Sequence, residues 1–205
     1  WHEQVRDNWG KGWFHNLKTL RSNFAEYVFK GTWKRLNTLS RSDAIQKPFA
    51  LYFFFLWWLM ISFALLNVVV DGVSAPSWGS LLADLGILIG VVFGGYWLFN
   101  KMHLFWVNRI MYFFSSYSKR QVPDVQKREV QFANQILDTV RSSEFDEVVL
   151  VGHSVGSVLT LGVMLHLVTE KKLDKLKVVT IGHCSSAVSI LPNSSWFNES
   201  LERLK

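Results

Sequence analysis

The sequence of 205 residues has little cysteine and lacks several familiar ligand-binding motifs. Its single cysteine, Cys184, excludes a disulfide within the chain and suits a reducing compartment. Cys184 and the histidines show none of the spacings that bind zinc, and no Gly-Lys-Ser or Gly-Lys-Thr indicates a phosphate-binding loop. We therefore expect no metal and no other cofactor.

Charge is absent from one long stretch of the chain. Residues Phe49 to Val70 contain no charged side chain, and as a helix this run would be about 33 Å long, enough for a bilayer core of about 30 Å. A second apolar run, Leu81 to Phe99, contains one acid, Asp84, near its beginning. We predict a transmembrane hairpin over residues 49–100, with spans at about 49–70 and 81–99. Two buried core helices are the alternative, but such helices would show a polar stripe.

Basic residues are missing from the loop of this hairpin, residues 71–80, and frequent on both sides of it. Lys and Arg number nine in residues 1–48 and six in residues 100–128. The positive-inside rule then places both termini in the cytoplasm and the loop outside. The net charge of +6 is explained by attraction to anionic lipid headgroups. No nucleic-acid-binding motif accompanies it, so we expect no nucleic acid as a partner.

Two further segments are rich in aromatic residues. Residues 1–48 mix Trp, Phe and Tyr with Lys and Arg, which is typical of helices lying among lipid headgroups, although a specific binding surface is an alternative. The juxtamembrane segment 101–122 carries little charge, and it either continues the second span or bends along the membrane surface.

From Pro123 onward the pattern is that of a soluble α/β domain, residues 123–205. Pro123 favours a helix start, with Asp124 as the N-cap. Strands are predicted at 147–152 and 177–182, because both runs are short and continuously apolar, and an apolar helix is predicted between them. This order indicates a parallel sheet with crossover helices. The apolar positions that recur at helical spacing in the first helix are Val130, Ala133, Ile136, Leu137 and Val140.

The first strand leads directly into a Gly-x-Ser-x-Gly motif, Gly152-His153-Ser154-Val155-Gly156. A nucleophilic serine requires a buried strand, a sharp strained turn and an immediate helix, with small flanking residues that let helix and strand approach closely. Gly152 and Gly156 are those small residues, and the N–H of Val155 would stabilise an oxyanion at the helix N-terminus. Ser154 is thus a candidate nucleophile, and a structural turn is the alternative.

The segments EVVLVGHSVGS and KVVTIGHCSSAVSILP resemble the middle of an α/β-hydrolase of the lipase and esterase kind, and in particular bacterial membrane-anchored hydrolase-like proteins with a transmembrane hairpin before the nucleophile strand. The resemblance implies a partial α/β-hydrolase fold, Ser154 as nucleophile, Val155 as backbone oxyanion donor, Gly152 and Gly156 as elbow glycines, and a location in the bacterial inner membrane. In that family the acid and the histidine follow the serine. We expect both beyond Lys205, and the other oxyanion donor before Trp1.

The histidines and Cys184 can each be explained without a catalytic role. His153 and His183 are expected to line the pocket, and His183 is also a weaker candidate for the base because it follows the second strand. His166 is expected in a core or an interface, and Cys184 as a small buried side chain.

These features predict a membrane-anchored serine hydrolase that cleaves an ester or thioester of an acyl lipid through an acyl-enzyme on Ser154. The alternative is a catalytically silent scaffold or assembly subunit of a membrane complex. Membrane lipid is the expected partner, and a membrane-protein partner or a homo-oligomer stays open. Transport is not expected, since two mostly apolar helices provide no polar path.

Overall fold

The computed structural model describes residues 13–39, 49–74, 77–142, 144–168 and 173–204. The chain divides into two compact units. The first contains the elements up to Met111, and the second contains those from Tyr112 onward together with Lys30–Thr32. The predicted interfacial segment 1–48 is described only in its central part.

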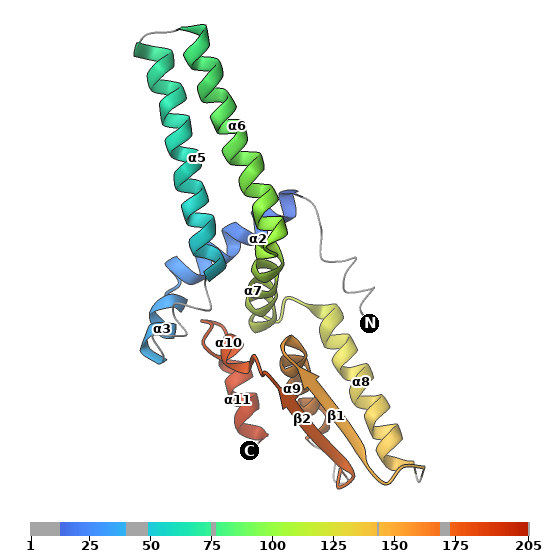
Figure 1. Ribbon diagram of the computed structural model, residues 1–205. Coiled ribbons are helices and arrows are strands. Elements are labelled where there is room, and N and C mark those ends of the chain that lie inside the picture. Colours follow the sequence, from blue (N-terminus) through green and yellow to red (C-terminus); the bar gives the residue numbers. More distant parts are fainter. Residues whose placement is uncertain (1–12, 40–48, 75–76, 143, 169–172, 205) are drawn as a thin grey trace. The chain divides into compact units, whose positions relative to one another are not determined.

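Two long apolar helices form a hairpin in the first unit, α5 (Phe49–Ser74) and α6 (Trp78–Lys101) (Figure 1). Both are long and apolar enough to cross a membrane, and most of their side chains are exposed. The core helix of a water-soluble protein would be buried instead. The helices pack through Trp57, whose Nε1 donates a hydrogen bond to Val91 O at 2.9 Å. Gly95 allows this approach, because a Cβ there would collide with the Trp57 ring.

Among the described residues, three helical segments precede the hairpin and one helix follows it directly. They are α2 (Trp13–Phe24), the π-helix η1 (Ala25–Phe29) and α3 (Thr32–Leu39) before the hairpin, and α7 (Leu104–Ser118) after it. The chain turns between α6 and α7 at His103, which has a positive φ of 56°. The juxtamembrane segment therefore bends and does not continue the second span. Phe105 of α7 packs against Phe54 and Phe99 of the hairpin, with ring centroids 5.3 and 6.1 Å apart.

The second unit is built around one small sheet. Strands β1 (Val148–His153) and β2 (Leu176–Ile181) pair in parallel, with Val148 opposite Leu176 and His153 opposite Ile181. The helices that follow α7 in this unit are α8 (Pro123–Arg141), α9 (Val155–Leu167), α10 (Ser185–Ser189) and α11 (Ser195–Arg203). Ala133, Val163 and Leu167 form the core, where α8 and α9 meet one side of the sheet through Leu150 and Leu176.

The predicted partial α/β-hydrolase fold is wrong. The described residues form mostly helices and only two strands, paired in a single sheet. An α/β fold of that kind needs a larger parallel sheet with helices on both faces. Here the outward face of the sheet carries exposed Val149, Val151, Val179 and Ile181. The sequence pattern predicted only these two strands, and the larger sheet was implied by the resemblance alone.

The start and the inner face of α8 also differ from expectation. Val122 is the N-cap and Pro123 the first helical residue, so Asp124 lies inside the first turn and does not cap the helix. Val130 is 42% exposed, whereas its neighbour Glu129 is buried. The inner face therefore carries a carboxyl group where an apolar side chain was predicted.

Candidate functional site

Ser154 lies at the junction between β1 and α9 and has an unusual backbone conformation. Its φ is 53° and its ψ is −122°, in a region that side chains with a Cβ rarely adopt. Such a conformation costs about 1–3 kcal/mol and persists only when surrounding structure holds it. The candidate nucleophile is therefore the strained residue of a sharp strand-to-helix turn.

The sheet holds Ser154 at the carboxyl edge of both strands. The N–H of Ser154 donates to Ile181 O at 2.9 Å, which adds one hydrogen bond beyond the last strand residue, His153. Because the strands are parallel, the residues that follow β2 reach the same edge. Ser154 and the turn after Ile181 are thus neighbours.

The two glycines of the motif have different surroundings. A Cβ on Gly152 would collide with Thr160 Oγ1 and would come within 2.9 Å of Ser157 Cα, so the start of α9 lies directly against the strand. A Cβ on Gly156 would meet no atom within 4 Å. Close approach of helix and strand therefore depends on Gly152 and not on Gly156.

Ser157 joins the two sides of the site. Its Oγ donates to Ser154 O at 2.6 Å and accepts the N–H of Cys184 at 2.9 Å. The Cys184 Sγ lies 4.0 Å from Ser154 Oγ. Cys184 is half buried, so its thiol borders the candidate nucleophile and is not a core residue. Ser157 was not among the residues predicted for the site, and Cys184 was expected to be a small buried side chain.

A signal for this neighbourhood was present in the sequence. In a parallel pair the carboxyl ends of both strands meet at one edge, and Cys184 follows the second strand as Ser154 follows the first. Gly182, with a φ of 58°, makes the turn that brings Cys184 back toward Ser154.

Val155 is the first residue of α9, and Ser154 makes no side-chain capping hydrogen bond to this helix. The first N–H groups of a helix have no acceptor within the helix. The positive end of the helix dipole lies at the same place and favours negative charge. The N–H of Val155 thus lies at the positive end of α9, directly after Ser154.

Among the described residues, neither His153 nor His183 makes a hydrogen bond to the Ser154 hydroxyl. His153 is exposed at the end of β1, and His183 is exposed with its Nδ1 3.2 Å from Ser185 Oγ. His166 is exposed on α9 and does not lie in the core. Within the part of the chain that the structure describes, the group recorded next to Ser154 Oγ is the thiol of Cys184, and no imidazole or carboxylate hydrogen-bonds it.

A buried carboxyl group lies elsewhere in the second unit. Glu129 of α8 is 6% exposed, and Tyr117 OH donates to its Oε1 at 2.8 Å. Burial raises the pKa of Glu129 to about 7, against the hydrogen bond from Tyr117 and the charge of Arg120, which lower it. Gly162 of α9 leaves room for this pair, because a Cβ there would collide with the Glu129 carboxyl and contact the Tyr117 hydroxyl.

Comparison with known proteins finds no matching family model, no matching curated protein and no matching solved structure.

Proposed function

We propose that this protein is a membrane-anchored serine hydrolase that cleaves an ester or thioester of an acyl lipid through an acyl-enzyme on Ser154. The observation that carries the proposal is the backbone of Ser154, with a φ of 53° between a strand and a helix. Strain of this kind accumulates at functional sites.

The conformation of Ser154 argues against a purely structural turn. Glycine adopts a positive φ without steric cost, so a turn with no other task is most stable with glycine at that position. The chain instead has glycine at Gly152, where the helix touches the strand, and keeps a hydroxyl at the strained residue. A side chain retained at such a cost is consistent with chemistry at that side chain.

The reaction follows from the groups around Ser154. Its Oγ attacks the acyl carbonyl carbon, forming a C–O bond, and the oxyanion accepts a hydrogen bond from the N–H of Val155. Collapse of the tetrahedral species breaks the bond to the leaving alcohol or thiol, which takes the proton that a base has removed from Ser154. Water then hydrolyses the acyl-enzyme. In this proposal Ser154 is the nucleophile and the N–H of Val155 is one oxyanion donor, and the base is a group outside the described residues.

The membrane location rests on the two apolar helices α5 and α6. The basic residues on both sides of the hairpin support cytoplasmic termini, with the loop on the opposite side. This topology supports the proposal that Ser154 works on the cytoplasmic side of a bacterial inner membrane, where a membrane lipid could reach it without crossing water.

The second candidate is a catalytically silent scaffold or assembly subunit of a membrane complex. One observation favours it: among the described residues, the neighbour of Ser154 Oγ is a thiol at 4.0 Å and not a base.

A fluorophosphonate probe that reacts with activated serines distinguishes the two candidates. The full-length protein in its membrane should be labelled, and Ser154→Ala should abolish labelling. The matched control is Ser185→Ala, which removes another hydroxyl near the same edge of the sheet and should leave labelling intact. A folded protein that is not labelled, or labelling that survives Ser154→Ala, would support the silent subunit.

A further inference from the structure

The helix formed by α2 and η1 buries polar side chains. Four of its six buried residues are polar, and these four are at most 5% exposed. Positions three or four apart lie on one face of a helix, so the four polar groups form an inward stripe. The buried residues are Asn16, Thr19, Leu20, Asn23, Glu26 and Tyr27.

Hydrogen bonds to α7 fix the direction of this stripe. Asn23 Nδ2 donates to Asn108 O at 2.7 Å and to Asn108 Oδ1 at 2.8 Å, and Asn108 Nδ2 donates to Thr19 Oγ1 at 2.9 Å. Asn23, Asn108 and Thr19 are all fully buried. Rotating the helix about its axis would leave these buried groups without partners, which costs about 1–3 kcal/mol each. The opposite face is therefore held outward.

That outward face carries the large apolar side chains. Phe14 is 85% exposed and Phe29 is 79% exposed, and Phe24 and Val28 are exposed as well. In water this arrangement is unfavourable, because burying one Phe side chain would stabilise the protein by about 1.5–3 kcal/mol. The cost disappears when the outward face contacts lipid instead of water.

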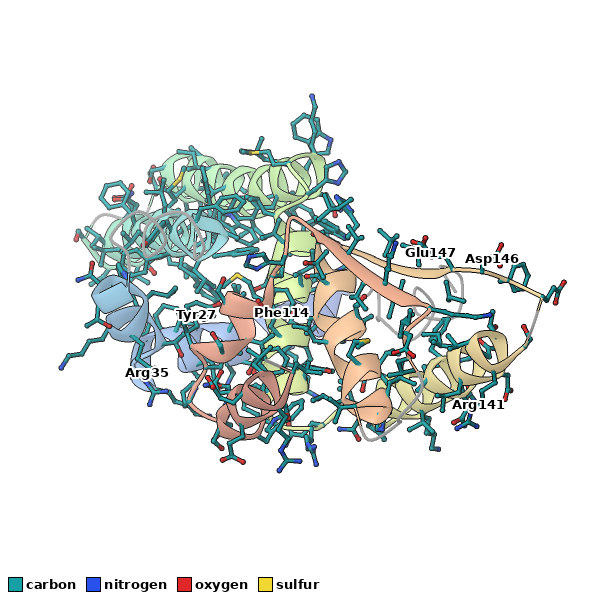
Figure 2. All side chains as sticks on the ribbon, turned by 90° about the horizontal axis from the view of Figure 1, so that it is seen from below. Tyr27, Arg35, Phe114, Arg141, Asp146 and Glu147 are labelled. Atoms are coloured by element: carbon teal, nitrogen blue, oxygen red, sulfur yellow. The ribbon has the colours of Figure 1, made fainter. Side chains whose placement is uncertain are left out.

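Basic side chains are interleaved with these apolar ones. Lys18 and Arg21 are exposed on the same face of α2 as Phe14, at helical spacing. Lys34 and Arg35 are exposed on α3, and in Figure 2 Arg35 lies at the periphery, whereas Tyr27 lies among the helices. Long basic side chains over an apolar surface extend toward phosphate groups at the membrane surface.

Contacts within the first unit place α3 at one end of the hairpin. Trp33 of α3 packs against Tyr52, with ring centroids 5.5 Å apart, and Tyr52 lies in the first turn of α5. Lys101 lies over the Trp97 ring, 4.9 Å from its centroid, where α6 ends. Aromatic and basic residues at the ends of spans mark the headgroup layer. The same layer is within reach of α3.

We propose that the outward face of α2, η1 and α3 binds anionic phospholipid headgroups at the membrane surface where α5 begins and α6 ends. The face comprises Phe14, Lys18, Arg21, Phe29, Lys34 and Arg35. The apolar rings enter the boundary of the acyl chains, and the four cations bind lipid phosphates. The interaction rests on α5 and α6 as membrane spans and is independent of the chemistry at Ser154.

Lipid selectivity tests the charged part of this face. The full chain is reconstituted in mixed phosphatidylcholine and phosphatidylglycerol vesicles, and the fraction of each spin-labelled lipid immobilised by the protein is measured. We expect a preference for phosphatidylglycerol that falls toward equality in Lys18→Glu/Arg21→Glu and in Lys34→Glu/Arg35→Glu. The matched reversal Lys127→Glu/Arg128→Glu, on exposed positions of α8, should leave it unchanged. The same preference for phosphatidylglycerol in the natural protein and in all three double variants would overturn the proposal.

A second measurement tests the apolar part without any enzymatic readout. A spin label is attached at Phe29→Cys in a Cys184→Ser background, and its collision rates with oxygen and with a water-soluble nickel chelate are compared. Oxygen, which concentrates among acyl chains, should collide more often. Greater access to the nickel chelate would place Phe29 in water, contradict binding to lipid, and favour a protein partner for this face.

Discussion

Replacing Glu129 with glutamine should change how the stability of the second unit depends on pH. The pKa of Glu129 in the folded protein is about 7, and its ordinary value is 4.5. A raised pKa means that the folded state holds the proton more tightly than the unfolded state does. The stability that the neutral carboxyl contributes is therefore fully present below about pH 4.5 and is lost as pH rises through about 7.

The difference between these two pKa values corresponds to about 3 kcal/mol, because a tenfold change in proton affinity is about 1.4 kcal/mol. Glutamine is neutral at every pH and still offers Tyr117 OH an acceptor. The free energy of unfolding of Glu129→Gln, relative to the natural protein, should rise by about 3 kcal/mol between pH 4.5 and pH 8.

The assay is denaturant unfolding of the full chain in detergent micelles at several pH values. Glu199→Gln is the control, since Glu199 is exposed on α11. This variant should follow the natural protein across the whole range. A difference in unfolding free energy between Glu129→Gln and the natural protein that stayed constant from pH 4.5 to pH 8 would show that Glu129 is not a buried acid held neutral.

Three substitutions test the packing around the site and in the hairpin. Gly152→Ala should destabilise the second unit by about 1–3 kcal/mol, because its methyl group would collide with the start of α9. Gly156→Ala has open space around its methyl group and should be tolerated. Equal effects of the two variants on the unfolding free energy would refute this packing. Ser157→Ala removes the acceptor of a backbone N–H and should cost about 1–3 kcal/mol in the same assay; a neutral result would contradict the bridging role. Gly95→Leu should lower the thermal midpoint of the reconstituted protein by forcing the packed indole away, and Gly94→Leu should not; similar midpoints would refute the hairpin packing.

The apolar runs carried enough information to predict the two long helices. Their length and lack of charge are properties of the chain itself, and α5 and α6 exceed the predicted spans by only a few residues. The strand and the helix on either side of Ser154 were also predicted, since a short continuous apolar run ends at the Gly-x-Ser-x-Gly motif and a longer apolar stretch follows it.

The size of the sheet and the role of charged residues were not readable. A strand pattern says nothing about how many neighbours a strand pairs with, so two strands were mistaken for part of a larger sheet. In α8 the predicted inner positions were all apolar, because carboxyl groups are rarely buried, whereas Glu129 shares the inner face with Ala133 and Val140.

If Ser154 is a nucleophile, its acyl-enzyme can be trapped. The full-length protein in its membrane is incubated with an isotope-labelled acyl lipid and with an acyl thioester, quenched in acid, digested and mapped by mass spectrometry. We expect an acyl adduct on Ser154 that hydroxylamine removes and that Ser154→Ala lacks. An adduct on another residue, or none in a folded protein with either donor, would contradict it.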